Sequence, residues 1–395
     1  MTPQPCVLLK YGELALKGRN RHLFERHLMR NLQHKVDTGT APVRIWRRQG
    51  FLVLHAPAAH EELVERARQV LGISVVQPAL RAHKTPEAAA DASLQALGER
   101  FDGEGTRTFA VRARRRDKRF PLTSEKLAAY VGRRVCRERG WQVDLREPEV
   151  TLWLEVDRSE VYVSVDRHRG QGGLPVGSSG HALVLLSGGF DSPVAAYRAM
   201  RRGLRCDFVH FTGAPYTGPS STYKAYALAR QLSRFQPEAR LHVVAIGAAQ
   251  RALATAGADR MQVVAHRRLM VRAAETLARG LGAQALVTGD SLGQVSSQTL
   301  SNLAAVEQAC DLPLLRPLVG WDKDEIITEA RRIGTEEVSV LDDEDCCTLL
   351  TPPGVATHTR PEQLSNVERR AGLDDLVEAV LANTQVLTLD GEARD

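Results

Sequence analysis

The sequence predicts an α/β protein whose C-terminal half is a doubly wound parallel sheet, with two α+β domains before it. Three observations support this prediction. At 395 residues the chain exceeds what one hydrophobic core usually serves. Strand and helix patterns alternate regularly after residue 181, as they do in parallel sheets covered on both faces. A segment rich in glycine and serine separates this half from a more mixed N-terminal half.

The N-terminal half reads as two small domains. Residues 1–61 contain a strand, CVLLKYG, a helix with apolar residues at helical spacing, RHLFERHLMRNLQHKV, and two more strands, VRIWRR and FLVLHA. Residues 62–168 contain three helical segments and several strands, among them TFAVRARR and the pair TLWLEVDR and EVYVSVDRHRG. The order of helices and strands in residues 62–168 is typical of a sheet with helices on one face.

Residues 169–180 are predicted to be a linker, and residues 181–395 the last domain. Seven of the eleven residues in GQGGLPVGSSG are glycine or serine, a composition that does not sustain a helix or strand. The strands ALVLLSGG, CDFVHFT, LHVVAIG and AQALVTGD then alternate with helical segments. Parallel sheets of this kind bind ligands at the carboxyl ends of their strands.

Composition excludes several classes of protein. No apolar run approaches the roughly 20 residues that span a bilayer, and the N-terminus lacks the pattern of a secretory signal, so we expect a cytoplasmic protein without membrane contact. The six cysteines are scattered without a CxxC pair. This argues against a disulfide framework, and we expect no tightly bound metal and no iron–sulfur cluster.

Positive charge is concentrated in the N-terminal half. Residues 1–180 hold 31 Lys and Arg against 21 Asp and Glu, whereas residues 181–395 hold 22 against 26. A basic surface attracts polyanions, so nucleic acid is the expected partner. The densest cluster precedes and follows Phe120 and comprises Arg112, Arg114, Arg115, Arg116, Lys118, Arg119, Lys126, Arg133 and Arg134. Neighbouring members on a strand are expected to point to opposite faces.

The most informative motif is SGGFDS, residues 187–192, which follows an apolar strand and precedes a helix with Pro193 in its first turn. Glycines admit an anion close to the backbone, Ser187 and Ser192 offer hydroxyls, and the helix N-terminus contributes free N–H groups. The motif lacks the GK[ST] of a Walker sequence and the spacing of GxGxxG. The segment is therefore predicted to bind phosphate in another way.

SGGFDS resembles the PP-loop of the ATP pyrophosphatases. This resemblance implies that ATP is cleaved between its α and β phosphates and that AMP is placed on a carbonyl oxygen of the substrate. It also implies that Asp191 helps to hold Mg²⁺ against the pyrophosphate.

Further segments resemble one family along nearly the whole chain, the bacterial tRNA 4-thiouridine synthases, also called tRNA sulfurtransferases. They are YGELALKGRNR, VHF, HRRLMVR, GDSLGQVSSQTL, LRPLVGWDKDEII and DCCTLLTP. The resemblance implies a ferredoxin-like domain and a THUMP RNA-binding domain before the PP-loop domain. It also implies ATP-dependent replacement of O4 of a tRNA uridine, uridine 8 in this family, by sulfur.

The same resemblance implies roles for individual residues. Lys323 in GWDKDE matches a family lysine that steadies the transferring charge. His210 and Phe211 are expected to flank adenine, and Arg267 to meet a phosphate. The full set of expected ATP-binding positions is Leu185, Leu186, Ser187, Gly188, Gly189, Asp191, Ser192, His210, Phe211, Arg267, Gly289 and Gln298.

Cys347 aligns with the catalytic cysteine of the family and is expected to carry a persulfide. Cys346 or Cys206 would resolve the spent sulfur by thiol–disulfide exchange. Some members carry a C-terminal rhodanese domain, which this sequence lacks, so the sequence resembles the short form. A separate cysteine desulfurase is therefore expected to supply sulfur, and a role in making the thiamine thiazole becomes doubtful.

Two rival hypotheses stay open from the sequence. One is a PP-loop enzyme that makes a 2-thionucleoside, against which the missing CxxC pairs and the basic N-terminal half count. The other is a non-catalytic THUMP protein that senses nucleotide, against which Asp191 and Cys347 count. A homodimer is a further hypothesis, because the acceptor end and the modified uridine of tRNA are far apart.

Overall fold

The computed structural model describes residues 2–37, 42–55, 60–101, 105–342, 350, 352 and 354–389. Cys346 and Cys347 lie outside these residues. The chain divides into two compact units, residues 1–175 and 176–395, and each is described here by itself. None of the helices in the described part combines the length and the apolar character that crossing a membrane requires.

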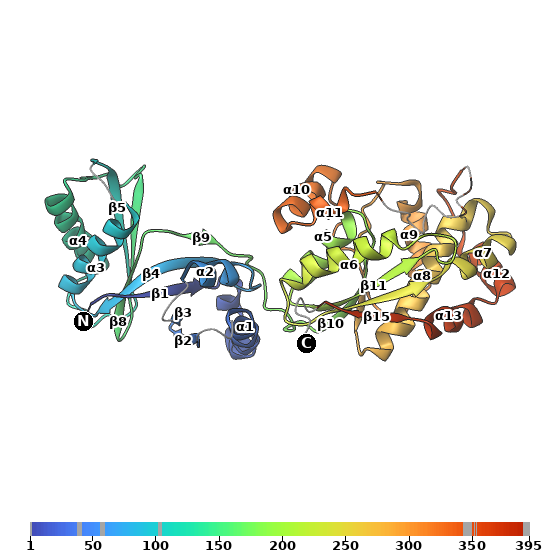
Figure 1. Cartoon of the computed structure of the whole chain (residues 1–395), viewed down its shortest axis with the longest axis horizontal. Coiled ribbons are helices and arrows are strands. Elements are labelled where there is room, and N and C mark those ends of the chain that lie inside the picture. Colours follow the sequence, from blue (N-terminus) through green and yellow to red (C-terminus); the bar gives the residue numbers. More distant parts are fainter. Residues whose placement is uncertain are drawn as a thin grey trace. The chain divides into compact units, whose positions relative to one another are not determined.

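The first unit is built on one continuous sheet in the order β2-β3-β1-β4-β8-β7-β5-β6, with β9 also paired to β4 (Figure 1). Its elements are β1 (Gln4–Lys10), η1 (Glu13–Leu16), η2 (Gly18–Asn20), α1 (Arg21–Val36), β2 (Arg44–Arg48), β3 (Phe51–His55), α2 (His60–Arg68), β4 (Val75–His83), α3 (Pro86–Arg100), β5 (Thr108–Arg115), α4 (Ser124–Arg139), β6 (Gln142–Val143), β7 (Val150–Val156), β8 (Glu160–Ser164) and β9 (His168–Arg169). The antiparallel pairing of β4 with both β1 and β8 joins the two predicted domains into one sheet.

Two apolar cores lie against this sheet. Helices α1 and α2 share a core with β1, whereas α3 and α4 pack with β5, β7 and β8 in another. Leu63 and Val64 of α2 pack in the same core as Leu9 and Leu28. The boundary predicted between residues 61 and 62 thus falls inside a helix that packs with the first domain, and the packing favours a boundary after α2.

The first part of the predicted linker is attached to the first unit. The Gly170 N–H donates to the Ser74 carbonyl at 3.0 Å, and the Gly172 N–H donates to the Ile73 carbonyl at 2.7 Å. A Cβ at Gly170 would lie 2.3 Å from that Ile73 oxygen, so this close approach requires glycine. The division between the units falls at residues 175 and 176, within the predicted linker.

The second unit confirms the predicted doubly wound sheet. Its strand order is β14-β13-β10-β11-β12-β15, parallel except for the edge strand β15, with helices on both faces (Figure 1). Its elements are β10 (His181–Leu185), α5 (Asp191–Arg201), β11 (Arg205–Thr212), α6 (Ser220–Ser233), β12 (Arg240–Ala245), α7 (Gly247–Thr255), η3 (Asp259–Met261), α8 (Gln262–Gly280), β13 (Ala285–Val287), η4 (Ser296–Gln298), α9 (Leu300–Glu307), β14 (Leu314–Leu315), α10 (Lys323–Ile333), α11 (Glu336–Ser339), α12 (Pro361–Ala371), α13 (Leu373–Ala382) and β15 (Gln385–Thr388).

The strand order creates a switch point at β10. From β10 the chain proceeds to β11 and β12 on one side, and then returns to add β13 and β14 on the other. Connections that diverge in this way leave a crevice at the carboxyl end of the central strand, where α/β proteins bind ligands. The segment SGGFDS follows β10, so the fold places it at this crevice.

Candidate active site

The loop of residues 187–192, called the nucleotide loop below, begins two residues after the end of β10 and runs into the first turn of α5. The hydroxyl of Ser192 accepts a hydrogen bond from the Ser187 N–H at 2.8 Å, and the two serine hydroxyls lie 2.9 Å apart. The Gly189 N–H donates to the Ser187 hydroxyl at 3.3 Å. These short-range bonds hold the loop in a compact turn at the positive end of the α5 dipole.

Two glycines near this loop differ in their surroundings. A Cβ at Gly289, just after β13, would lie 2.6 Å from the Ser192 nitrogen and 2.8 Å from the Asp191 carbonyl carbon. Gly289 therefore lets the neighbouring strand end pack directly against the start of α5. A Cβ at Gly189 would meet only the Ser187 hydroxyl, at 3.7 Å, so the space beside Gly189 is open to a ligand.

Asp191, the first residue of α5, is joined to two distant segments. Nζ of Lys323 lies 2.7 Å from Oδ1 of Asp191, and the Gln294 amide donates to Oδ2 at 3.1 Å. Lys323 begins α10, whose N-terminus is fixed by a capping box between Asp322 and Glu325. The Asp191 and Lys323 side chains are 23% and 42% exposed, so both can meet a ligand.

The surroundings of Asp191 bear on the expected Mg²⁺. No group of three metal-binding side chains occurs among the described residues. Mg²⁺ is commonly bound by one or two carboxylates together with substrate phosphates and water. Asp191 fits that pattern, because its carboxylate is partly exposed beside the nucleotide loop.

Arg267 and Gln298 meet at a buried carboxylate, Asp290, which is 3% exposed. Asp290 pairs with Arg267, accepts from Arg316 Nε at 3.3 Å and from the Thr288 hydroxyl at 2.8 Å, and lies 3.5 Å from the Gln298 amide nitrogen. Arg267 also donates to the Ser297 carbonyl at 3.3 Å. The structure therefore brings both predicted residues together, with the guanidinium of Arg267 already paired.

Gln298 retains one unused group. Its side-chain oxygen is buried and accepts no hydrogen bond from the described residues. A buried acceptor without a partner is costly, and it is often completed by a ligand or water.

The strand-end residues His210, Phe211 and Leu186 are interior. Phe211 is 6% exposed and packs in the core of the second unit, and Leu186 is 2% exposed. Nδ1 of His210 lies 2.9 Å from the Leu186 carbonyl oxygen, and Nε2 lies 3.2 Å from the Ser221 hydroxyl. The expected arrangement, with the two side chains of 210 and 211 on either side of adenine, is not what these positions offer, because parallel strands are covered on both faces. Leu185 is partly buried against the same core.

An open hollow lies beside Asp191 and Lys323. Its volume is about 490 Å³, and it is lined by Ser291, Leu292, Gly293, Gln294, Val319, Gly320, Trp321, Asp322 and Lys323. Sequence reasoning missed Gln294 and Asp290 as parts of this site. Both stand in the segment GDSLGQ, whose polar residues directly after a buried strand were the available signal.

Among the cysteines, the structure speaks against Cys206 as the resolving thiol. Cys206 lies on β11 and is fully buried, and burial raises the pKa of its thiol far above the ordinary value. A buried thiol is a poor nucleophile because the thiolate is the reactive form. Burial thus makes Cys206 less suited than an accessible thiol to resolve the spent sulfur.

The basic cluster of the first unit divides into exposed and structural members. Arg115 donates to the carbonyls of Lys118, Phe120 and Leu122, and Arg116 donates to Glu155 at 3.1 Å. These two arginines hold the loop after β5. The exposed members are Arg112, Arg114, Lys118, Arg119, Lys126 and Arg133. Arg134 pairs with Glu138 and Asp91.

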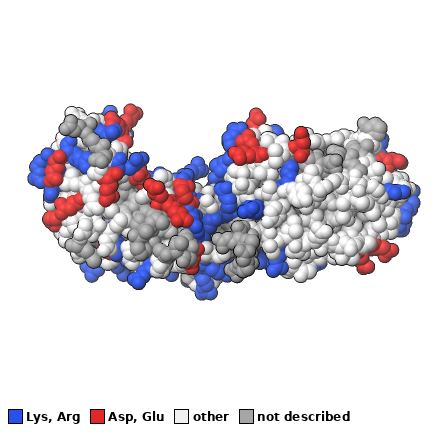
Figure 2. Space-filling view, viewed as in Figure 1, with Lys and Arg blue, Asp and Glu red and all other residues white. Residues whose placement is uncertain are grey.

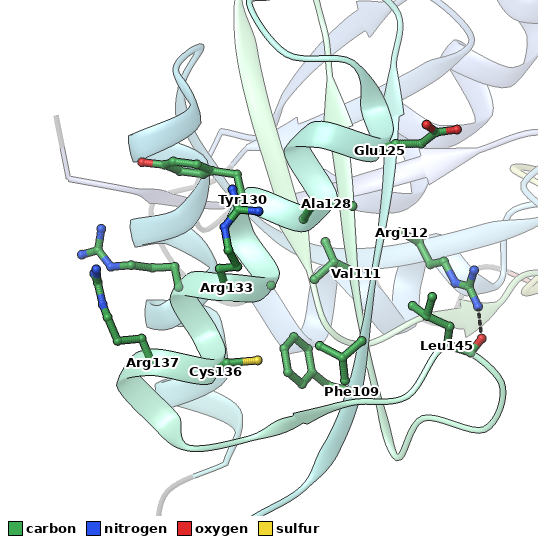
Figure 3. A pocket seen from close by; sticks show the side chains of 14 residues that line it. Phe109, Val111, Arg112, Glu125, Ala128, Tyr130, Arg133, Cys136, Arg137 and Leu145 are labelled. Carbon is green, nitrogen blue, oxygen red and sulfur yellow. Dashed lines mark hydrogen bonds between the residues drawn. The ribbon is translucent and has the colours of Figure 1, made fainter.

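Beside these residues α4, β5 and residues 143–145 enclose a groove of about 1150 Å³ (Figure 3). Its floor includes Phe109 and Val111, and Arg133 and Arg137 extend from α4 beside it. Leu145 is 61% exposed, and its carbonyl accepts from Arg112 at 2.8 Å. Figure 2 shows basic and acidic side chains intermixed on the visible face of this unit. The groove joins apolar surface to the guanidinium groups of Arg133 and Arg137.

Comparison with known proteins gives matches along the whole chain. Residues 6–76 match the ThiI ferredoxin-like domain, residues 84–166 match the THUMP domain, and residues 177–373 match the family described as thiamine biosynthesis protein (ThiI). These matches follow the predicted order of domains.

Curated relatives include probable tRNA sulfurtransferases from Nocardia farcinica and Thermus thermophilus. The first is 62% identical over 97% of this chain and 94% of its own length. The second is 42% identical over 96% of this chain and 92% of its own length. A crystal structure of a 4-thiouridine synthetase–RNA complex with bound ATP superposes with a TM-score of 0.88, at 32% identity, covering 97% of this chain and 99% of that one.

Proposed function

The chain belongs to the ThiI family of tRNA sulfurtransferases, and on that basis we propose that it converts a tRNA uridine, uridine 8, to 4-thiouridine. ATP would be consumed to AMP and pyrophosphate. The observation that carries the proposal is the pairing of Asp191 with Lys323 beside an open anion loop at the switch point of the sheet. The related synthetase with RNA and bound ATP supports both ligands.

ATP binds along the carboxyl edge of the second unit. The N-terminus of α5 and the open space beside Gly189 face the phosphates, and Ser187 and Ser192 add hydroxyls. The side-chain oxygen of Gln298, which accepts no hydrogen bond from the described residues, is an acceptor for an amino group such as that of adenine. Main-chain groups at the ends of β10 and β11 border the base, because the side chains there are buried.

Activation places AMP on the uridine. The oxygen O4 attacks the α-phosphorus of ATP, the proton on N3 of the uracil passes to solvent, the bond to the β-phosphate breaks, and pyrophosphate leaves. Lys323 stabilises the negative charge that develops on the pyrophosphate, while Asp191 holds the ammonium of Lys323 in place. Mg²⁺ bound at Asp191 would supply additional charge neutralisation for the phosphates.

Sulfur then replaces the activated oxygen. The terminal sulfur of a Cys347 persulfide attacks C4, a C–S bond forms, and AMP departs with O4 as the C4–O4 bond breaks. The thiolate of Cys346 attacks the Cys347 sulfur, which breaks the S–S bond, releases 4-thiouridine and leaves a disulfide for an external thiol to reduce. Burial of Cys206 favours Cys346 for this step. A cysteine desulfurase recharges Cys347, and a sulfur-carrier role in thiamine thiazole synthesis is a secondary proposal.

The first unit binds the tRNA. Its exposed basic residues contact phosphates, and its groove beside α4 receives an unstacked nucleotide. These contacts determine where the RNA lies rather than which base reacts.

The test is nucleoside mass spectrometry of unmodified tRNA after incubation with the protein, ATP, Mg²⁺ and a cysteine desulfurase with cysteine. The proposal predicts 4-thiouridine together with tRNA-dependent release of pyrophosphate. A 2-thionucleoside instead would support the rival thiolation reaction. No pyrophosphate in the presence of tRNA would support a binding protein without this activity.

A further inference from the structure

Asn302, in the first turn of α9, is fully buried and makes four side-chain hydrogen bonds. Its amide nitrogen donates to the Ser296 carbonyl at 3.1 Å and to the Ala356 carbonyl at 2.8 Å. Its oxygen accepts from the Thr359 N–H at 3.2 Å and from the Thr359 hydroxyl at 2.5 Å. Both donors and both acceptor sites of the asparagine amide are thus used to join two segments that lie more than fifty residues apart in the sequence.

One of these segments belongs to the nucleotide site. Ser296 begins η4, which also contains Ser297 and Gln298. The Ser297 carbonyl accepts from Arg267, and the Gln298 amide lies 3.5 Å from Asp290. η4 is thus also held from the side of the nucleotide site, independently of Asn302, so these contacts remain when the Asn302 side chain is removed.

The other segment follows the cysteines in the sequence. Ala356 and Thr359 come nine and twelve residues after Cys347. Two neighbours of Asn302 reinforce the attachment, because the Thr299 hydroxyl donates to the Thr357 carbonyl at 2.6 Å and the Ser301 hydroxyl donates to the Thr359 carbonyl at 3.3 Å. Thr359 is itself only 3% exposed.

The segment before the cysteines is attached to the same edge. The hydroxyl of Ser339, at the end of α11, donates to the Gly189 carbonyl of the nucleotide loop at 3.2 Å. Lys224 of α6 donates to the Leu341 carbonyl. Ser339 and Leu341 precede Cys346 by seven and five residues. On one side of the cysteines Ser339 is thus bonded to the nucleotide loop, and on the other side Ala356 and Thr359 are bonded to Asn302, which also holds η4.

We propose that Asn302 is a positioning residue that couples the nucleotide site to the cysteine-bearing segment, so that sulfur is delivered to the uridine that ATP has activated. This inference rests on the proposed function, in which Cys347 carries the sulfur. Asn302 touches neither substrate nor cofactor. Its contribution is to hold residues 356–359 in register with η4, and misplacement of a reacting group by about 1 Å can cost about a hundredfold in rate.

The experiment measures two steps in the same protein, tRNA-dependent pyrophosphate release and 4-thiouridine formation with a persulfide donor. Asn302→Ala removes all four bonds, and Thr359→Val removes one hydroxyl bond with little change of volume. Leu303→Ala is the matched control, because Leu303 is a buried residue of the same helix whose side chain contributes packing only.

In both test variants we expect pyrophosphate release to stay near the wild-type rate and 4-thiouridine formation to fall, about tenfold to a hundredfold for Asn302→Ala. Pyrophosphate is then released without sulfur transfer. A parallel loss of both steps, as expected for Leu303→Ala, or no loss in either step would overturn the inference. Absence of 4-thiouridine with the wild-type protein would instead count against the proposed function.

Discussion

Among the residues of the proposed active site, Asp191 offers the most direct test of the mechanism. Its carboxylate joins α5 to Lys323 and Gln294, which come from distant parts of the second unit. An electrostatic role predicts that the charge matters more than the shape of the side chain.

Asp191→Asn keeps the size of the side chain and removes its charge. We expect tRNA-dependent pyrophosphate release to fall about a hundredfold, because Lys323 loses its counterion and the phosphates lose a site for Mg²⁺. Asp324→Asn, an exposed neighbour on α10, is the control and should leave the rate unchanged. Equal rates for Asp191→Asn and the wild type would remove Asp191 from the mechanism.

Gly289→Ala tests the contact between the end of β13 and the nucleotide loop. The new Cβ would lie 2.6 Å from the Ser192 nitrogen, a backbone atom that cannot move alone. Overpacking of this kind costs about 1–3 kcal/mol, so ATP affinity should fall about tenfold to a hundredfold in calorimetric titration. Gly280→Ala has open space around its Cβ and should bind ATP normally. Normal binding by Gly289→Ala would contradict the assigned contact.

At the scale of single elements, the nucleotide loop was the part of the site that local sequence predicts best. The strand, the two glycines and the helix with proline in its first turn all lie within about fifteen consecutive residues, so the whole turn can be recognised from local sequence. The pairing of Arg267 with Asp290 lies beyond such reasoning, because the partners come from α8 and from the end of β13. Whether a side chain at a strand end is buried, as Phe211 is, also depends on helices that pack later in the chain.

Local sequence also does not show which arginines and lysines of the basic cluster are exposed. The structure therefore gives a prediction about α4 and the residue that follows β5. Lys126→Ala and Arg133→Ala should each weaken tRNA binding and reduce the salt dependence by about one unit of the slope of log K against log salt, without changing stability. Arg116→Ala removes the hydrogen bonds to Glu155 and Gln49. It should lower the free energy of unfolding by about 1–3 kcal/mol. Filter binding measures the affinity for tRNA, and urea denaturation measures stability. Equal effects of all three variants on both quantities would contradict the division into exposed and structural members.

The packing of α7 against α8 predicts a pH dependence of stability. Burial lowers the pKa of His266 to about 4, because its ring is enclosed between Gln250 and Gln262. An unfolded histidine, with a pKa of about 6.5, takes up a proton first as the pH falls, so protonation favours the unfolded chain. The contribution of His266 to the free energy of unfolding should therefore decrease by about 3 kcal/mol as the pH falls from 6.5 to 4.

His266→Gln checks this prediction. Its stability difference from the wild type, measured by urea denaturation, should shift in favour of the variant as the pH is lowered through this range. His358→Gln, at an exposed position, is the control for the substitution itself. A constant difference between His266→Gln and the wild type would contradict the assignment.

For the whole molecule, the half of the chain with excess positive charge is also the half that forms the first unit. The N-terminal 180 residues carry the positive excess and form the sheet with the basic groove, whereas the C-terminal half carries the nucleotide site. The order of domains and the parallel sheet were predictable, because alternation of strands and helices is a long-range pattern written in the sequence. The continuous sheet through β1, β4 and β8 was not, because pairing across two domains has no local signal.

The central claim is that O4 of the uridine is activated by AMP before sulfur arrives. The most direct measurement uses tRNA whose target uridine carries oxygen-18 at O4, with unlabelled ATP and a desulfurase, and records the mass of the AMP released. The account predicts AMP that carries the label, in an amount equal to the 4-thiouridine formed, and no product with Cys347→Ser. Unlabelled AMP accompanying 4-thiouridine would contradict the account.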